Sequence, residues 1–119
     1  MKAALFTLAA LCVAFLMVAT ASAGSKNQSY VKAGLLCIHH YEGSWTDPGY
    51  PYWGGLQMDA SFQNTYGYMK IHGTRIYFGR LWGTADHWPI WAQLQAGMNG
   101  YRARGWWPWP NTARVCGLL

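Results

Sequence analysis

The chain has few acidic residues. Its 119 residues contain four aspartates and glutamates against nine lysines and arginines, and Glu42 is the only glutamate. A basic balance suits an anionic polymer, a nucleic acid or a membrane surface. The basic residues are scattered along the chain rather than clustered, which argues against a nucleic-acid groove. Any chemistry that needs a glutamic acid must therefore depend on Glu42.

Motifs for metal binding and nucleophilic catalysis are also absent. The sequence contains neither a CxxC nor an HExxH motif, which are common patterns of zinc sites. His39 and His40 are adjacent, so on a helix they would point about 100° apart and could not share a metal ion on one face. Ser44 lies near these histidines, but no nucleophile elbow surrounds it. We expect no metal site and no cofactor.

The N-terminal segment has the pattern of a secretory signal. Lys2 is followed by an apolar stretch over residues 3–19 and then by Ala21-Ser22-Ala23, an A-x-A cleavage box. We therefore expect a signal peptide over 1–23, a polar disordered leader over 24–28 and a single domain over 29–119. The stretch is close to the length of a membrane span, so an uncleaved anchor is the alternative. After cleavage the protein is expected to be secreted, without stable membrane insertion.

Two cysteines remain after the signal, Cys37 and Cys116. In an exported protein such a pair is most simply a disulfide, and a small domain gains stability from one. Free thiols or a metal pair are the alternatives. All eight tryptophans and eight tyrosines also follow the signal. Aromatic faces can bind sugar rings, although most of these side chains could equally build the core.

The first helix that the apolar spacing predicts after the signal ends at Glu42. Val31, Leu35, Ile38 and Glu42 share one stripe at helical spacing, with Ser29 as a possible cap. Glu42 would thus lie on the buried face at the end of this helix. A loop follows over 43–51, and the spacing then predicts a short hairpin or extended turn over 52–58, through two adjacent glycines.

The second half of the domain is less regular. Asp59 is placed to cap a short helix that ends at Gly67. Residues 68–83 show no clean period. A longer helix is predicted from Asp86, as its cap, to Arg104, and the aromatic, proline-rich segment 106–110 is expected to be a rigid extended tail. The fold class expected is α+β, mainly helical with a short β-hairpin and one disulfide.

Several short motifs occur in a characteristic order along the domain: Cys37, Glu42-Gly43, Tyr52-Trp53-Gly54-Gly55-Leu56-Gln57-Met58, Arg104-Gly105-Trp106, Trp109-Pro110 and Cys116. On these residues the domain resembles the resuscitation-promoting-factor type of transglycosylase-like domain, a small member of the lysozyme-like superfamily. That resemblance implies a lysozyme-like fold, a secreted, cell-wall-associated monomer that acts on peptidoglycan glycan strands, and Glu42 as the catalytic acid. Two departures are Gly43, where the family often has serine, and residues 68–83, which look like an insertion.

The resemblance also bears on mechanism. Animal-type lysozymes have an aspartate where this chain has Tyr52, which favours the single-acid scheme of lytic transglycosylases at the MurNAc-GlcNAc β-1,4 bond. Hydrolysis by water activated through Asp47, as in a muramidase, stays open. Gln57 and Tyr52 would orient the sugar, and Trp53 or Trp45 could stack on it.

Two functions from other classes compete with the enzyme. One is a non-catalytic cell-wall binding module that has kept the fold. The other is a basic, aromatic antimicrobial protein that acts on membranes. The chain has no long basic amphipathic helix after the signal, which disfavours the membrane-active protein. The presence of Glu42 and Gln57 favours the enzyme over the binding module.

Overall fold

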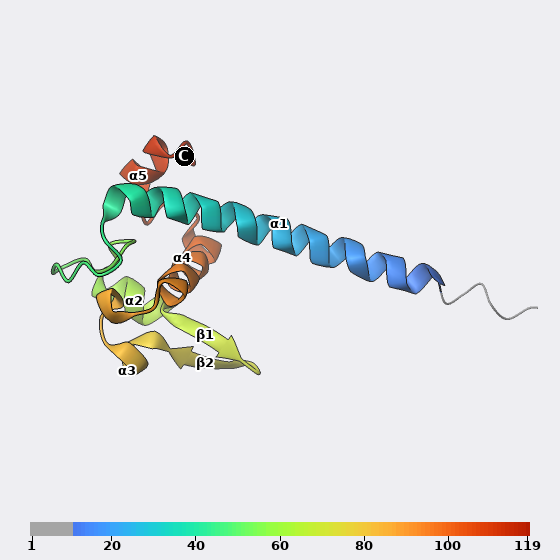
Figure 1. Cartoon of the computed structure of the whole chain (residues 1–119), viewed down its shortest axis with the longest axis horizontal. Helices are drawn as coiled ribbons and strands as arrows, with labels where there is room; N and C mark the ends of the chain where they lie inside the picture. The colour runs from blue at the N-terminus through green and yellow to red at the C-terminus, as the bar shows by residue number, and fades with distance from the viewer. Residues whose placement is uncertain (1–10) are drawn as a thin grey trace, which may run out of the picture. The chain divides into compact units, whose positions relative to one another are not determined.

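The computed structural model describes residues 11–119, with side chains from residue 27 onward. The first helix, α1, spans Leu11–Glu42 (Figure 1). Contacts divide the chain into a first unit that ends at Tyr30 and a second unit, Val31–Leu119, which contains every site discussed below. The described part of the chain contains no helix that is both long and apolar enough to cross a membrane.

The start of α1 differs from the sequence prediction. We expected a disordered leader over 24–28 and a helix from Ser29, but α1 continues through both. Residues 24–28 contain no proline, which is the residue that breaks a helix, and Gly24 costs only about 1 kcal/mol relative to alanine. Residues 1–10 of the expected signal peptide lie outside the described residues, and cleavage after Ala23 stays a prediction.

The last turns of α1 supply one wall of the core. Val31, Leu35 and Ile38 are buried, as their spacing predicted. They pack in one cluster with Leu56 and Met58 from the following loop. Burial of such side chains contributes about 1.5–3 kcal/mol each. The end of α1 is therefore held firmly, and Glu42 with it.

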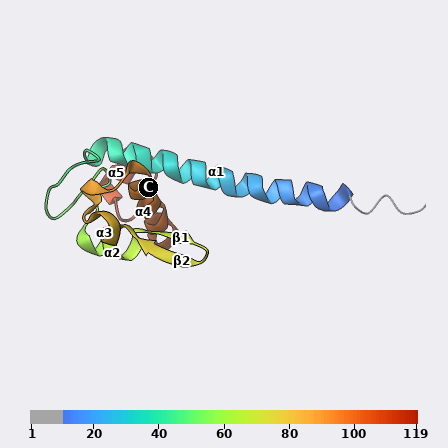
Figure 2. The same ribbon diagram turned by 60° about the horizontal axis from the view of Figure 1, so that its bottom comes forward.

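Helix α2, Ala60–Tyr66, forms where its capping residues predicted it. The side chain of Asp59 accepts a hydrogen bond from the backbone N–H of Phe62, and Gly67 ends the helix. A cap of this kind is worth about 1 kcal/mol. Helix α4, Ile90–Arg104, packs against α2 and against the strand that follows α2 in the chain (Figure 2).

The two-stranded sheet lies in the segment that showed no period. Strands β1, Tyr68–Ile71, and β2, Thr74–Tyr77, pair antiparallel around His72-Gly73, whose φ angles are 49° and 81°. Positive φ at both turn residues defines the type I′ turn that suits a tight hairpin. The hairpin predicted over 52–58 is instead a turn closed by one bridge between Trp53 and Met58.

The side chains of the hairpin interact across its strands. The guanidinium of Arg75 lies 4.3 Å from the centre of the Tyr68 ring. A hydrogen bond with the Tyr77 side chain raises the pKa of Arg75 above its ordinary value. Arg75 is therefore charged at any physiological pH, and it gives the hairpin a fixed positive charge.

Three elements connect the hairpin to the C-terminal helices: α3, Phe78–Trp82, the short 3-10 helix η1, Ala85–His87, and α4. The prediction that Asp86 caps α4 was wrong. Pro89 disfavours helical backbone at the residue before it, so α4 begins only after Pro89. Asp86 instead accepts a hydrogen bond from Thr84 and pairs with His87. The predicted stop at Gly105 is confirmed.

The expected extended tail over 106–110 is also wrong. The chain turns there and forms helix α5, Pro110–Val115. Trp106 and Trp109 are buried, and the indole Nε1 of Trp109 donates to the carbonyl of Leu56 at 2.8 Å. Burial of two large aromatic side chains is strongly favourable, and it requires the chain to fold back rather than extend.

The disulfide between Cys37 and Cys116 is confirmed. It joins the last turns of α1 to the residue that ends α5. The two cysteines are separated by 79 residues in sequence, and closing a loop of that length is worth about 4–5 kcal/mol on the chain-entropy model. The second unit is thus mainly helical, with one antiparallel hairpin and one disulfide.

Candidate functional site

Glu42 lines a cavity of about 210 Å³ at the end of α1, which we call the Glu42 cavity. Its side chain is half-buried. Tyr52 and Gln57, both expected at the site, line the same cavity. The other wall comes from the segment that leads into α5, so residues distant in sequence meet here. This wall consists of Pro108, Trp109, Pro110, Asn111 and Thr112.

Thr112 holds the carboxylate of Glu42. Its hydroxyl Oγ1 donates a hydrogen bond to Glu42 Oε1 at 2.5 Å. Glu42 Oε2 makes no hydrogen bond to the residues that the structure describes, so it can receive a ligand group. Sequence reasoning missed Thr112, which is 70 residues from Glu42. The pairing of Cys37 with Cys116 was the available signal, because it brings α5 to the end of α1.

Gln57 lines the cavity, and the nitrogen of its side-chain amide is already hydrogen-bonded within the protein. Its Nε2 donates to Asp47 Oδ2 at 2.8 Å and to the carbonyl of Gly54 at 3.0 Å. An amide nitrogen has two hydrogens, so both are taken. The remaining polar atom is Oε1, an acceptor for a hydroxyl or amide N–H of a ligand.

Asp47 does not line the Glu42 cavity. Besides Gln57, it accepts a hydrogen bond at Oδ1 from the backbone N–H of Gly49. A Cβ added at Gly43 would lie 3.0 Å from Gln57 Nε2 and 3.2 Å from Asp47 Oδ2. The glycine after Glu42 therefore lets the backbone approach this pair closely. Asp47 positions Gln57 and is not placed beside Glu42's open oxygen.

An adjoining cavity of about 180 Å³ extends the site. It shares Tyr52, Gln57, Pro108 and Trp109 with the Glu42 cavity. Trp107 and Tyr52 are 60% and 49% exposed, so their ring faces are open to a ligand. Arg104 and Asp59 also line this part. Sequence reasoning had not assigned Trp107 or Arg104 to the site.

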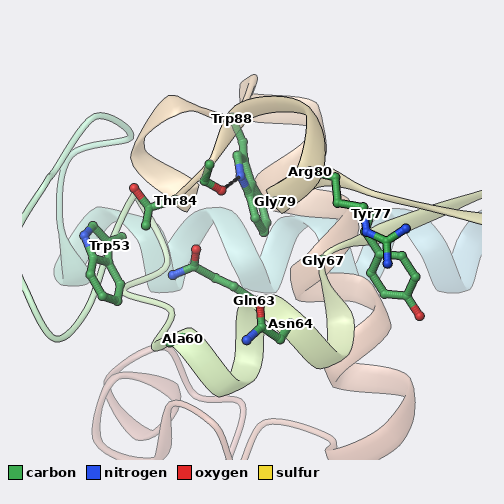
Figure 3. A pocket seen from close by; sticks show the side chains of 11 residues that line it. Trp53, Ala60, Gln63, Asn64, Gly67, Tyr77, Gly79, Arg80, Thr84 and Trp88 are labelled. Carbon is green, nitrogen blue, oxygen red and sulfur yellow. Dashed lines mark hydrogen bonds between the residues drawn. The ribbon is translucent and has the colours of Figure 1, made fainter.

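Trp45 and Trp53, which were expected to stack on sugar, lie outside the Glu42 cavity. Trp45 stacks on His39, with ring centroids 3.8 Å apart. It covers Gly55, where an added Cβ would meet the indole at 2.2 Å. Trp53 lines a different cavity (Figure 3). Neither lines the Glu42 cavity.

A buried glutamine holds the turn that carries these residues. Gln93 on α4 has no exposed surface. Its Oε1 accepts from the backbone N–H of Gly55 at 2.9 Å, and its Nε2 donates to the carbonyls of Trp45 and Trp88 at 2.8 and 3.1 Å. Buried polar groups that are fully hydrogen-bonded fix a local structure, because breaking them leaves unpaired groups. Gln93 therefore links the turn over 52–58 to two other loops.

Comparisons with known proteins identified no relative of this chain. No family model, no curated protein and no solved structure matches the chain. Within residues 11–119, moreover, no three histidine, cysteine, aspartate or glutamate side chains form a group that could hold a metal ion. The function of the chain must therefore be inferred from the geometry of the site itself.

Proposed function

We propose that this protein is a secreted enzyme that cleaves peptidoglycan glycan strands at the MurNAc-GlcNAc β-1,4 bond, with Glu42 as the general acid. The observation that carries the proposal is the state of the Glu42 carboxyl. It is half-buried in a cavity, with Oε1 held by Thr112 and Oε2 open to a ligand. A glycosidase acid needs such a fixed, partly desolvated carboxyl beside the leaving oxygen.

A lysozyme-like architecture is part of the same proposal. The helix that ends in Glu42, the glycine turn with Gln57 and the disulfide occur in the order that the resemblance implies. The basic balance of the chain suits the anionic bacterial cell wall. We expect a monomer at the cell wall, exported by the segment 1–23.

The proposed reaction uses the open oxygen of Glu42 twice, first as an acid and then as a base. Glu42 Oε2 would give its proton to the glycosidic oxygen as the bond to the anomeric carbon breaks. The 2-acetamido group of the substrate then stabilises the positive charge at that carbon. Glu42 takes the proton of the 6-hydroxyl as this oxygen closes the anhydro ring. The protons balance, and the carboxyl returns to its starting state.

This single-acid scheme is favoured over hydrolysis through Asp47. Both oxygens of Asp47 accept hydrogen bonds, from Gln57 and from Gly49, and Asp47 does not line the Glu42 cavity. A base that activates water must reach that water directly. Asp59 caps α2 through Oδ1, and it lines the adjoining cavity but not the Glu42 cavity. Neither aspartate is therefore placed as the second catalytic carboxylate.

The neighbouring residues suit the binding of a sugar chain. Gln57 Oε1 can accept from a sugar hydroxyl or acetamido N–H, and Tyr52 lies between the two adjoining cavities. Trp107 offers an exposed indole face for stacking on a further ring. The strand would thus cross from the Glu42 cavity toward Trp107.

Fragment masses test the proposed reaction. Soluble fragments released from purified peptidoglycan should carry 1,6-anhydro ends, which are one water lighter than hydrolysis products. Hydrated reducing ends would replace the single-acid scheme by a muramidase reaction. Release of no fragments by the folded protein would refute cleavage.

The second candidate is a non-catalytic peptidoglycan-binding module. It is favoured by the lack of a second carboxylate among the residues that line the Glu42 cavity, together with the exposed rings of Tyr52 and Trp107. Such a module would sediment with insoluble peptidoglycan without releasing fragments. Measuring sedimentation and fragment release on one sample separates the two functions.

A further inference from the structure

A further cavity, larger than the two cavities beside Glu42, shares no lining residue with either of them. It has a volume of about 590 Å³, and we call it the Trp53–Arg80 trough. Figure 3 shows Trp53 at one end and Tyr77 with Arg80 at the other, with Gln63 between them. Its volume lies in the range of small-molecule sites, about 300–1,000 Å³. The residues used below are Trp53, Gln63, Asn64, Tyr77, Arg80 and Trp88.

The trough contains an unneutralised positive charge. Arg80 is exposed, and its guanidinium lies 5.7 Å from the centre of the Tyr77 ring. It forms no ion pair with the described residues, and no aspartate or glutamate is among the residues that line the trough. The aromatic ring restrains the guanidinium while leaving its N–H groups free. An anionic group of a ligand would therefore find its partner at this end.

The remaining walls are aromatic or already hydrogen-bonded. The indole Nε1 of Trp88 donates to the carbonyl of Gly83 at 2.7 Å. Gln63 uses both ends of its amide, donating to Met58 and accepting from Ala85. These groups form a fixed surface that needs no ligand to satisfy it. The side-chain amide of Asn64, by contrast, makes no hydrogen bond within residues 11–119.

The side chains that line the trough together favour one class of ligand, a ring that carries a carboxylate. Trp53 offers a half-buried indole opposite the free guanidinium of Arg80. The free amide of Asn64, on α2, also lines the trough. A ring with polar edges can stack on an indole, and a carboxylate can bind the guanidinium with two hydrogen bonds. A neutral sugar would leave Arg80 unused, and a simple anion would leave the aromatic wall unused.

We propose that the Trp53–Arg80 trough is a second binding site, specific for an acidic sugar whose carboxylate pairs with Arg80. The particular sugar rests on the proposed function: in a glycan strand of peptidoglycan it is N-acetylmuramic acid, whose lactyl group carries a carboxylate wherever the peptide is missing. The trough would then hold peptide-free stretches of the strand, separately from the bond that Glu42 cleaves.

Two monosaccharides that differ only in the lactyl group test the site. The full chain is titrated with N-acetylmuramic acid and with N-acetylglucosamine, and the indole N–H signals of Trp53 and Trp88 are followed by NMR. The acid should bind about tenfold more tightly or better, as expected for a charge-assisted hydrogen bond. Equal affinities, or no binding of N-acetylmuramic acid, would overturn the proposal.

Three matched substitutions locate the carboxylate. Arg80→Gln should remove the preference for the acid. Arg102→Gln is the control, because Arg102 is exposed near the end of α4 and lines none of the three cavities. Arg104→Gln should also preserve the preference. A preference that survives Arg80→Gln would refute the trough. A preference that disappears in Arg104→Gln would also refute it, and would place the acid in the cavity beside Trp107.

The result is independent of the proposed cleavage. Neither monosaccharide contains a glycosidic bond to a second sugar, so binding requires no action by Glu42. A protein that releases no fragments but prefers N-acetylmuramic acid would refute the enzyme and support the trough. The opposite outcome would refute the trough and leave the enzyme intact.

Discussion

The two cavities beside the turn over 52–58 carry opposite charge. The Glu42 cavity is lined by one carboxyl and no cation, whereas the Trp53–Arg80 trough is lined by one guanidinium and no carboxylate. Tyr52 lines the first and Trp53 the second, so neighbouring residues of one turn point to different sites. Proton donation needs a carboxyl without a competing cation, and anion binding needs the reverse. The turn therefore separates two incompatible electrostatic environments.

The two sites also differ in how they are held together. Glu42 and Thr112 meet because the disulfide joins α1 to α5 across 79 residues of sequence. The trough is formed mainly by the continuous segment 60–88, with Trp53 added by the turn. Changes to the disulfide should therefore act on the Glu42 cavity first, and changes to the turn should act on both.

Loss of the disulfide should have the largest effect on stability. A Cys37→Ser, Cys116→Ser double variant is expected to lose about 4–5 kcal/mol of unfolding free energy, measured by urea denaturation. At temperatures where this variant is still folded, cleavage should fall more than binding of N-acetylmuramic acid. An unchanged unfolding free energy, or equal losses of both functions, would break the distinction between the sites.

Gln93 tests the shared turn. Gln93→Met keeps the volume but leaves the N–H of Gly55 and the carbonyls of Trp45 and Trp88 unpaired, which should cost about 3 kcal/mol. Both cleavage and acidic-sugar binding should weaken. Gln95→Met is the control, since Gln95 makes one hydrogen bond, to Asn99, and should cost about 1 kcal/mol. Equal melting temperatures for the two variants would contradict the role of Gln93.

Thr112 tests the Glu42 cavity alone. Thr112→Val removes the hydroxyl that holds Glu42 Oε1 and should lower kcat/KM for cleavage about tenfold. Thr112→Ser keeps the hydroxyl and should retain most of the activity. Binding of N-acetylmuramic acid should be the same in both. If valine and serine behave alike, the hydrogen bond has no part in positioning the acid.

Asp47→Asn should have the smallest effect. The substitution leaves an oxygen that can still accept from Gln57, so the cleavage rate should fall less than about tenfold. If Asp47 activated water instead, the loss would be that of a general base, about 10²–10⁴ in rate. Cleavage rates measured beside the fragment masses decide between the two roles.

Local signals were enough for much of the fold. The stripe of Val31, Leu35 and Ile38 predicted the buried face of α1, and Asp59 and Gly67 predicted the ends of α2. Each of these depends on residues within a few positions of one another, where spacing and capping preferences act directly. The disulfide followed from the number of cysteines and the expected export of the chain.

Features set by distant contacts were missed. The hairpin turn His72-Gly73 lacks the asparagine or aspartate that usually marks such a turn. Helix α5 forms because Trp106 and Trp109 are buried against elements far away in sequence. At the site, Glu42, Tyr52 and Gln57 were predicted together, but Thr112 was not. In the turn that carries Tyr52 and Gln57, Gly54 and Gln57 have positive φ angles of 75° and 49°, which spacing alone does not reveal.

Glu42→Gln tests whether Glu42 is the proton donor. Glutamine keeps the shape of the side chain, and its oxygen can still accept from Thr112, but it cannot donate an acidic proton. The variant should release soluble fragments from purified peptidoglycan at least about 10²-fold more slowly than the wild type. Its melting temperature and its affinity for N-acetylmuramic acid should be unchanged. Release at the wild-type rate by this folded variant would refute Glu42 as the general acid.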